Sequence, residues 1–225
     1  MFRQQLEELG IAIEHEVIPE RDIGGLLEEI AQCDASRSRA GIRHAMRHRA
    51  IAQFAEDVRL LHLAREVLGR GAFPFRATLF DKSPASNWLV GWHQDTALPL
   101  RQRRDVAGWG PWSVKDGVTY AHAPAMALSQ LVALRVHLDD STAQNGPLRV
   151  LPGTHTNGVL TDDEMLRLAT TTPSQECVLP AGGILAMRPL IVHASSKSRS
   201  AMPRRVLHIE YAARRFVDDL ELAIA

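Results

Sequence analysis

The amino-acid sequence predicts a mostly β protein with flanking helices, whose short strands form a sandwich or barrel, of which the jelly roll is one form. From residue 71 onward the chain consists of short apolar runs separated by turn residues, which is the pattern of such folds. Apolar residues at helical spacing dominate the part before residue 71. The length of 225 residues suits a single domain, since domains average about 150 residues.

The composition narrows the class of protein. The 26 basic and 26 acidic residues cancel, which argues against a domain whose whole surface binds nucleic acid or an anionic membrane. Only Cys33 and Cys177 are present, against ten histidines, so a disulfide scaffold or a cysteine-rich zinc module is excluded while a metal site of nitrogen and oxygen ligands is not. No signal peptide or long apolar run is visible, so we expect a cytoplasmic protein.

Residues 1–70 are expected to be mainly helical and to pack on the strands. Pro19 is expected in the first turn of a helix that runs through Ile30. A second helix is predicted from about Ile51 to Leu68, with Gly69 as its C-terminal stop. Between the two helices lies a basic segment, which we interpret as a solvated face; an arm that meets an anionic substrate is the alternative. Its arginines are Arg37, Arg39, Arg43, Arg47 and Arg49.

Residues 71–215 are expected to form the strand scaffold. The predicted strands are Phe75–Phe80, Trp88–His93, Leu131–Leu138, Leu148–Leu151, Glu176–Leu179, Ile184–Met187 and Arg205–Tyr211. Residues 101–127 show little periodicity and are expected to be a long excursion from this scaffold. Four tryptophans in this region could line a pocket: Trp88, Trp92, Trp109 and Trp112. We nevertheless expect Trp88 and one of the other three to be core residues.

Three predicted strands end in or contain a histidine followed two residues later by an acid, so that both side chains point to one face. Two histidines and one carboxylate form the metal site of non-haem Fe(II) oxygenases. The three pairs are His93 and Asp95, His137 and Asp139, and His208 and Glu210. Asp139 begins a polar turn and is expected to serve as a turn or cap residue. His208 and Glu210 are expected to be a satisfied pair in the last strand, which favours His93 and Asp95 modestly.

A further histidine, His193, follows an apolar stretch and opens a polar segment that leads to Arg204 and Arg205. A guanidinium near a metal-binding histidine would suit a cosubstrate that carries a carboxylate, because arginine binds carboxylates through two hydrogen bonds. Neighbouring residues of a strand point to opposite faces, so we expect at most one of the two arginines to face inward.

Three blocks in this sequence resemble the phytanoyl-CoA dioxygenase family of Fe(II)- and 2-oxoglutarate-dependent oxygenases. They are Trp92–Thr96 (WHQDT), Leu138–His155 (LDDSTAQNGPLRVLPGTH) and His193–Arg205 (HASSKSRSAMPRR), in the family's order. The resemblance covers roughly residues 76–212 and implies a double-stranded β-helix, the cupin-like jelly roll. It also implies one Fe(II)/2-oxoglutarate dioxygenase domain over residues 1–225.

The resemblance implies a role for each matching residue. His93, Asp95 and His193 match the iron ligands and so would be the catalytic centre. Arg204 matches the arginine that binds the far carboxylate of 2-oxoglutarate, and Ser195 matches a serine that supports the same carboxylate. Ala194, Ser196 and Ser198 depart from the family, which has Gly, Gly and Asn at their positions. His155, at the end of the second block, is a weaker site candidate.

The activity that the resemblance implies is hydroxylation of an unactivated C–H bond in a small molecule, with O2 consumed and 2-oxoglutarate oxidatively decarboxylated to succinate. Asp95 favours hydroxylation, because related halogenases lack this carboxylate. Two alternatives remain: a jelly-roll binding protein without turnover, and a metal-dependent hydrolase or isomerase that uses the same three ligands.

Overall fold

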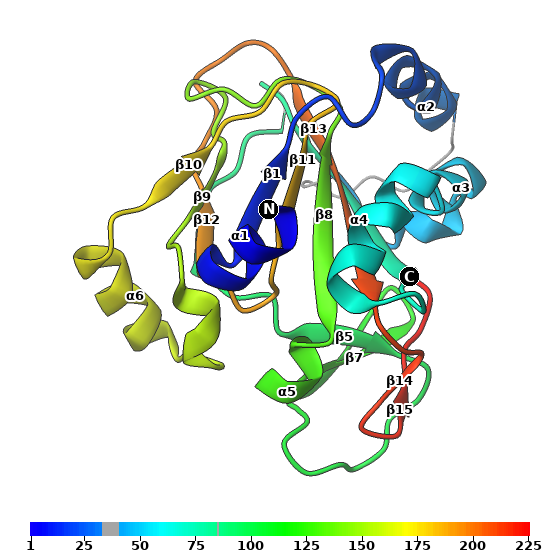
Figure 1. Cartoon of the computed structure of the whole chain (residues 1–225), viewed down its shortest axis with the longest axis vertical. Helices are drawn as coiled ribbons and strands as arrows, with labels where there is room; N and C mark the ends of the chain where they lie inside the picture. The colour runs from blue at the N-terminus through cyan, green and yellow to red at the C-terminus, as the bar shows by residue number, and fades with distance from the viewer. Residues whose placement is uncertain (33–40, 85) are drawn as a thin grey trace.

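The protein, described by a computed structural model over residues 1–32, 41–84 and 86–225, is built around two antiparallel sheets (Figure 1). The larger sheet has the order β1-β11-β8-β13-β3-β2, and the smaller has the order β10-β9-β12-β4. The larger sheet comprises β1 (Ile11–Glu14), β2 (Gly41–Ile42), β3 (Phe73–Lys82), β8 (Leu131–His137), β11 (Ile184–Met187) and β13 (Arg204–Ala212). The smaller comprises β4 (Val90–His93), β9 (Leu148–Val150), β10 (Gln175–Cys177) and β12 (His193–Ser195). This architecture confirms the predicted jelly-roll fold class.

One apolar cluster joins the two sheets face to face. It combines Ile11 and Leu185 of the larger sheet with Leu148, Val150 and Cys177 of the smaller one, all at most 5% exposed. Burying such side chains stabilises a fold by roughly 1.5–3 kcal/mol each. Because this cluster fills only one end of the space between the sheets, the other end is left for polar side chains.

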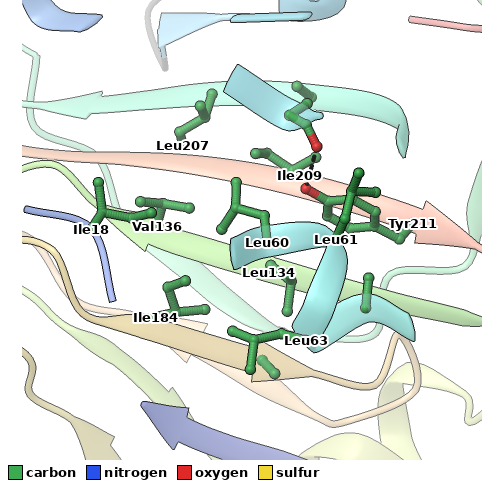
Figure 2. Close-up of a cluster of buried hydrophobic side chains, with 14 of the residues drawn as sticks. Ile18, Leu60, Leu61, Leu63, Leu134, Val136, Ile184, Leu207, Ile209 and Tyr211 are labelled. Atoms are coloured by element: carbon green, nitrogen blue, oxygen red, sulfur yellow. Dashed lines mark hydrogen bonds between the residues drawn. The ribbon is translucent and has the colours of Figure 1, made fainter. Parts of the chain in front are cut away.

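The outer face of the larger sheet is covered by helices of the N-terminal part, α2 (Glu20–Gln32), α3 (Arg49–Ala55) and α4 (Val58–Leu68) (Figure 1). Figure 2 shows Leu60 and Leu61 of α4 in the same apolar cluster as Leu207 and Ile209 of β13. In the same cluster the Tyr211 hydroxyl donates a hydrogen bond to the Ala55 carbonyl at 2.8 Å. The alternation of β13 therefore directs odd-numbered residues to the helices and even-numbered residues to the space between the sheets.

The helical stretch predicted from about Ile51 to Leu68 consists of two helices, and Gly69 follows the second as expected. The chain breaks at Glu56 and Asp57, and Asp57 caps the new helix α4 by accepting a hydrogen bond from the Arg59 backbone N–H at 2.8 Å. An N-cap aspartate stabilises a helix start by about 1 kcal/mol, and this local gain sets the break that apolar spacing alone does not reveal.

Several elements were not predicted from the sequence. Before α2, the N-terminal part holds α1 (Phe2–Leu9) and the edge strand β1, which pairs with β11. A 3-10 turn, Ala45–Arg47, precedes α3, and another, Thr154–Asn157, precedes α6 (Asp162–Thr171). The helix α6 begins with a capping box in which Thr161 and Glu164 bind each other's backbone N–H groups.

The excursion at residues 101–127 contains regular structure, contrary to expectation. Its strands β6 (Trp112–Lys115) and β7 (Val118–His122) form a three-stranded sheet with β5 (Ala97–Leu100), and α5 (Ala125–Leu128) follows. A hairpin of β14 (Phe216–Val217) and β15 (Leu220–Glu221) lies beside this sheet (Figure 1).

The two cysteines and part of the basic segment differ in whether the structure describes them. Cys33, Arg37 and Arg39 lie outside the described residues, whereas Cys177 is a buried free thiol. Among the described residues, no helix combines the length and the apolar character needed to cross a bilayer.

Candidate active site

Pairing of two strands brings His93, Asp95 and His193 together. His93 ends β4 and His193 begins β12, and the two histidines are direct partners in the antiparallel register. Their ring centroids lie 4.1 Å apart. The Asp95 carboxylate lies 3.8 Å from His93 Nε2 and 3.6 Å from His193 Nε2. One potential ligand atom from each residue lies within 4.8 Å of the others, which is a spacing that a single metal ion can bridge.

The hydrogen bonds of the two imidazoles prepare them to bind a metal. In each ring Nδ1 lies 2.9 Å from the carbonyl two residues earlier, Gly91 for His93 and Ile191 for His193. A carbonyl only accepts, so Nδ1 carries the proton and Nε2 keeps a free lone pair. Both free lone pairs lie on the side of Asp95. A donor set of two imidazoles and one carboxylate, oriented in this way, fits Fe(II).

Electrostatics keep these ligands in the protonation states that a metal requires. Burial opposes ionisation of Asp95, but the nearby histidines, His193 foremost, together with Arg76, hold its pKa well below the ordinary value. Burial lowers the pKa of His193 to about 4. The carboxyl is therefore ionised and the His193 ring neutral at physiological pH. The Asp95 side chain keeps 28% of its surface exposed because it faces a cavity.

This cavity has a volume of about 250 Å³ and lies between the two sheets. At one end, Arg204 is 3% exposed and Ser195 is 6% exposed. Arg204 donates to the Asn145 carbonyl at 3.2 Å and to Ser195 Oγ at 3.4 Å, while its Nη1 has no hydrogen-bond partner among the described residues. Because the Ser195 hydroxyl donates to the Gly146 carbonyl at 3.0 Å, its oxygen accepts from the cations around it.

Two further buried cations accompany Arg204. Lys82 Nζ donates to Ser195 Oγ at 2.9 Å and to the Ser196 carbonyl at 2.6 Å. Burial lowers the pKa of Lys82 to about 8 and those of Arg135 and Arg204 to about 10. Within the described residues none of the three forms an ion pair with a carboxylate. Burying unpaired cations is costly, so this end of the cavity is built to receive an anion.

The two adjacent arginines point in opposite directions. The carboxylate of Asp139 accepts hydrogen bonds from the Arg205 guanidinium at 2.7 and 2.8 Å and from its backbone N–H at 2.8 Å. Arg205 is therefore occupied on the outer face, and Arg204 alone of the pair lines the cavity. Asp139 acts as an ion-pair partner and backbone acceptor, so His137 and Asp139 do not form a metal site.

The remaining histidine candidates have other partners. Glu210 pairs with the Arg76 guanidinium, and His208 Nδ1 lies 3.1 Å from Arg135 Nη1, so these two residues form the satisfied pair that was expected on β13. Arginine only donates, which makes His208 a neutral acceptor; burial lowers its pKa well below the ordinary value. His155 binds the Glu7 carbonyl at 3.1 Å and lies in a different cavity.

Sequence reasoning missed much of the cavity wall. Arg76, Arg135 and Tyr120 were not predicted. A usable signal was present, because Arg76, Lys82 and Arg135 interrupt otherwise apolar strands, and a charge inside a buried strand needs a reason. Trp88 lines the cavity and is not a core residue, contrary to expectation. The other three tryptophans pack against apolar clusters away from it.

Fold and site together define a jelly-roll protein with a His-Asp-His metal site beside a buried anion-binding pocket. The model of the phytanoyl-CoA dioxygenase (PhyH) family matches residues 27–206, and the chain belongs to this family. The family's Fe(II)- and 2-oxoglutarate-dependent chemistry agrees with the donor set and with the neighbouring pocket.

Comparison with individual proteins gives one relative in sequence and many in structure. L-proline trans-4-hydroxylase from Streptomyces griseoviridis is 32% identical over 138 residues, which are 50% of this chain and 51% of that enzyme, so the match spans about half of each. HygX from Streptomyces hygroscopicus, solved with nickel and 2-oxoglutarate, has a TM-score of 0.69 at 17% identity, covering 97% of this chain and 89% of HygX. EctD from S. alaskensis, solved with 2-oxoglutarate and 5-hydroxyectoine, has a TM-score of 0.68 at 19% identity, with coverage of 93% and 74%. At these identities the structural matches establish a shared fold.

Proposed function

We propose that this protein is an Fe(II)- and 2-oxoglutarate-dependent oxygenase that hydroxylates an unactivated C–H bond of a small molecule. The observation that carries the proposal is one cavity lined both by the His-Asp-His set and by the buried cations Arg135 and Arg204, with Lys82 beside Ser195 at the same end. Within the described residues none of these three cations forms an ion pair with a carboxylate. A metal that shares its coordination sphere with a bound carboxylic acid needs both features. Membership of the family and the hydroxylase relative support the same activity.

In this proposal His93, Asp95 and His193 hold Fe(II). Arg204 and Ser195 bind the far carboxylate of 2-oxoglutarate, and Lys82 adds a second positive charge through the same hydroxyl. When bound, Fe(II), 2-oxoglutarate and O2 supply the oxidising chemistry, in which 2-oxoglutarate becomes succinate and carbon dioxide and one oxygen atom enters the substrate C–H bond. Three protein ligands leave the remaining metal positions free for these partners.

The residues of the chain bind and orient the reactants. The two Nδ1–H bonds fix the planes of the imidazoles, so that Nε2 of each ring would be available to a metal ion bound beside Asp95. Phe80, Trp88 and Leu148 line the cavity and limit the access of water to it. We further propose that residues 1–225 act as one oxygenase domain and that the protein works in the cytoplasm, where reducing conditions maintain Fe(II).

The test measures metal binding and 2-oxoglutarate turnover in the same preparations. Purified protein should bind one Fe(II) and convert 2-oxoglutarate to succinate in the presence of O2. His93→Ala and Asp95→Ala should abolish turnover and weaken metal binding at least 100-fold. Asp139→Ala is the matched control, because Asp139 ends the other histidine-x-aspartate pair and should leave both properties unchanged.

The outcomes separate the proposal from its alternatives. Unchanged turnover in the Asp95→Ala variant would remove the metal assignment. Metal binding without consumption of 2-oxoglutarate across a broad substrate panel would identify a binding protein. Turnover of a substrate that does not need O2 would identify a hydrolase or an isomerase.

A further inference from the structure

The cavity has a second cationic end, far from the buried cluster around Arg204. Strands β3 and β13 form one wall, with Lys82 opposite Arg204 and Arg76 opposite Glu210 in their antiparallel register. Six residues separate the two pairs along each strand, which corresponds to about 20 Å between their Cα atoms. Arg43 follows Ile42, the partner of Leu79, so its backbone lies near Thr78, about 13 Å along β3 from Lys82. A single carboxylate group at the Arg204 end therefore does not reach the second end. Whatever anion occupies the Arg204 end leaves the other end free.

At this second end, the hydrogen-bonding groups of Arg76 all have partners, whereas Arg43 and Lys115 have no buried acidic partner among the described residues. The guanidinium of Arg76 binds Glu210 through two nitrogens and the Ala97 carbonyl through the third at 2.7 Å. Arg43 follows β2, and among the described residues its one ion-pair partner is the exposed carboxylate of Asp116, at 3.6 Å; the Arg43 side chain is 49% exposed. Lys115 ends β6 and forms no ion pair within the described residues.

Tyr120 gives Lys115 a fixed support. Its side chain is 3% exposed, and its hydroxyl lies 2.8 Å from His44 Nε2. Lys115 Nζ lies 5.1 Å from the centre of the tyrosine ring, and Arg76 Cζ lies 5.9 Å from it. Cation–π contacts of this kind favour a defined position for an otherwise mobile lysine. Burial, with the nearby Arg43 and Arg76, lowers the pKa of Lys115, so an anion placed among these groups would relieve their mutual repulsion.

We propose that Arg43 and Lys115, which line the cavity together with Tyr120, bind an anionic group of the substrate, a carboxylate or a phosphate. All three residues line the same cavity as His93, Asp95 and His193, so a substrate held there by its anionic end extends toward the metal ligands. The cavity of about 250 Å³ is smaller than the roughly 300–1,000 Å³ typical of ligand sites, and 2-oxoglutarate fills part of it. The substrate is therefore a compact acid. This inference rests on the proposed function.

The experiment isolates the second end by filling the first. Protein loaded with Zn(II), which does not turn over, is saturated with N-oxalylglycine, an inert analogue of 2-oxoglutarate. Inorganic phosphate, L-proline and L-prolinamide are then titrated by calorimetry. Phosphate or L-proline should bind, and L-prolinamide should bind at least 10-fold more weakly than L-proline. The Arg43→Met and Lys115→Met substitutions should each raise the dissociation constant of the anion about 10-fold.

The control variant is Arg49→Met, which removes an exposed cation of the same basic segment that lies outside this cavity and should leave anion binding unchanged. Tighter binding of phosphate identifies a phosphate ester as the substrate class, and tighter binding of L-proline identifies a carboxylate. The inference is overturned if neither anion binds, or if the Arg43→Met and Lys115→Met variants bind them as the wild type does.

Failure of the proposed function would be seen separately. N-oxalylglycine binding is measured first. If N-oxalylglycine does not bind, the assignment of the Arg204 end to 2-oxoglutarate is contradicted, while the proposal for Arg43 and Lys115 is still open to test. In that case phosphate is titrated into Arg204→Met protein, in which the Arg204 end has lost one of its three cations while Arg43 and Lys115 are unchanged. Loss of binding on Lys115→Met in that background would still support the substrate site.

Discussion

Replacing Arg204 with methionine should stabilise the ligand-free protein and at the same time weaken its binding of 2-oxoglutarate. Burial lowers the pKa of Arg204 from 12.5 to about 10, which corresponds to about 3 kcal/mol of unfavourable free energy for the charged group in the folded state. Methionine has a similar length without the charge. The lost hydrogen bonds to Asn145 and Ser195 offset about 1–2 kcal/mol of this gain. The net expectation is a rise of about 1 kcal/mol in the free energy of unfolding.

The same substitution removes charge-assisted hydrogen bonds to the bound carboxylate, which are worth about 1.5–3 kcal/mol, so the dissociation constant of 2-oxoglutarate should rise about 10- to 100-fold. At a concentration of 100 times the wild-type dissociation constant, 2-oxoglutarate stabilises the wild type by about 2.7 kcal/mol but a 100-fold weaker variant by only about 0.4 kcal/mol. Urea unfolding of metal-loaded protein, with and without 2-oxoglutarate, measures both quantities. Arg205→Met is the matched control: it loses the partly exposed pair with Asp139, costs up to about 1 kcal/mol, and keeps the full ligand effect.

Two results would refute this reasoning. If the Arg204→Met variant is stabilised by 2-oxoglutarate as much as the wild type, the guanidinium does not bind the cosubstrate. If the ligand-free variant loses several kcal/mol, Arg204 is a structural group whose charge is well compensated, and the cluster with Lys82 and Arg135 is not a vacant anion pocket.

Three other predictions test the electrostatics and the scaffold. The pKa of Lys82 is about 8 in the folded state against 10.5 for a free lysine, so the unfolded chain binds more protons than the folded chain between these pH values. The free energy of unfolding of the ligand-free wild type should therefore rise with pH across this window. Urea titrations at about pH 7 and pH 10 measure the rise, and the Lys82→Met substitution should remove it. Tyr211→Phe leaves the Ala55 carbonyl without its buried donor and should cost about 1–2 kcal/mol in chemical unfolding, whereas an unchanged midpoint would mean that water replaces the hydroxyl. Thr161→Ala removes one half of the capping box with Glu164 and should cost about 1 kcal/mol, seen as faster amide exchange in the first turn of α6 and not in the sheets.

The sequence was most informative where chemistry depends on short spacing along a strand. Alternation predicted that only one of Arg204 and Arg205 faces inward, and the structure confirms it because Asp139 holds the other arginine. Spacing alone left three histidine-x-acid pairs as candidates. The resemblance selected His93 and Asp95, and only the register of β4 with β12 brings His193 beside them. Long-range strand pairing of this kind is not encoded in any local pattern.

The elements that sequence reasoning missed have two physical causes. Short edge strands such as β1 contain too few residues to show a period, and their burial depends on the neighbouring strand. Cavity residues such as Arg76 and Arg135 carry charges into strands that otherwise predict a core, and their partners lie far away in the chain: Glu210 for the first and His208 for the second. In both cases tertiary contacts decide the role.

The pairing of β3 with β13 sets the geometry on which both proposals depend. Even-numbered residues of β13 face the cavity, so Arg204, His208 and Glu210 lie along one wall, and the register fixes their partners Lys82 and Arg76 on β3 at opposite ends. A slip of β13 by one residue would turn Arg204 toward the helices and place Leu207 and Ile209 in the cavity. The apolar cluster that binds α4 to the other face of β13 prevents such a slip, because it buries Leu207 and Ile209 completely. The hydrophobic packing in Figure 2 therefore fixes which side chains of β13, Arg204 among them, face the space between the sheets.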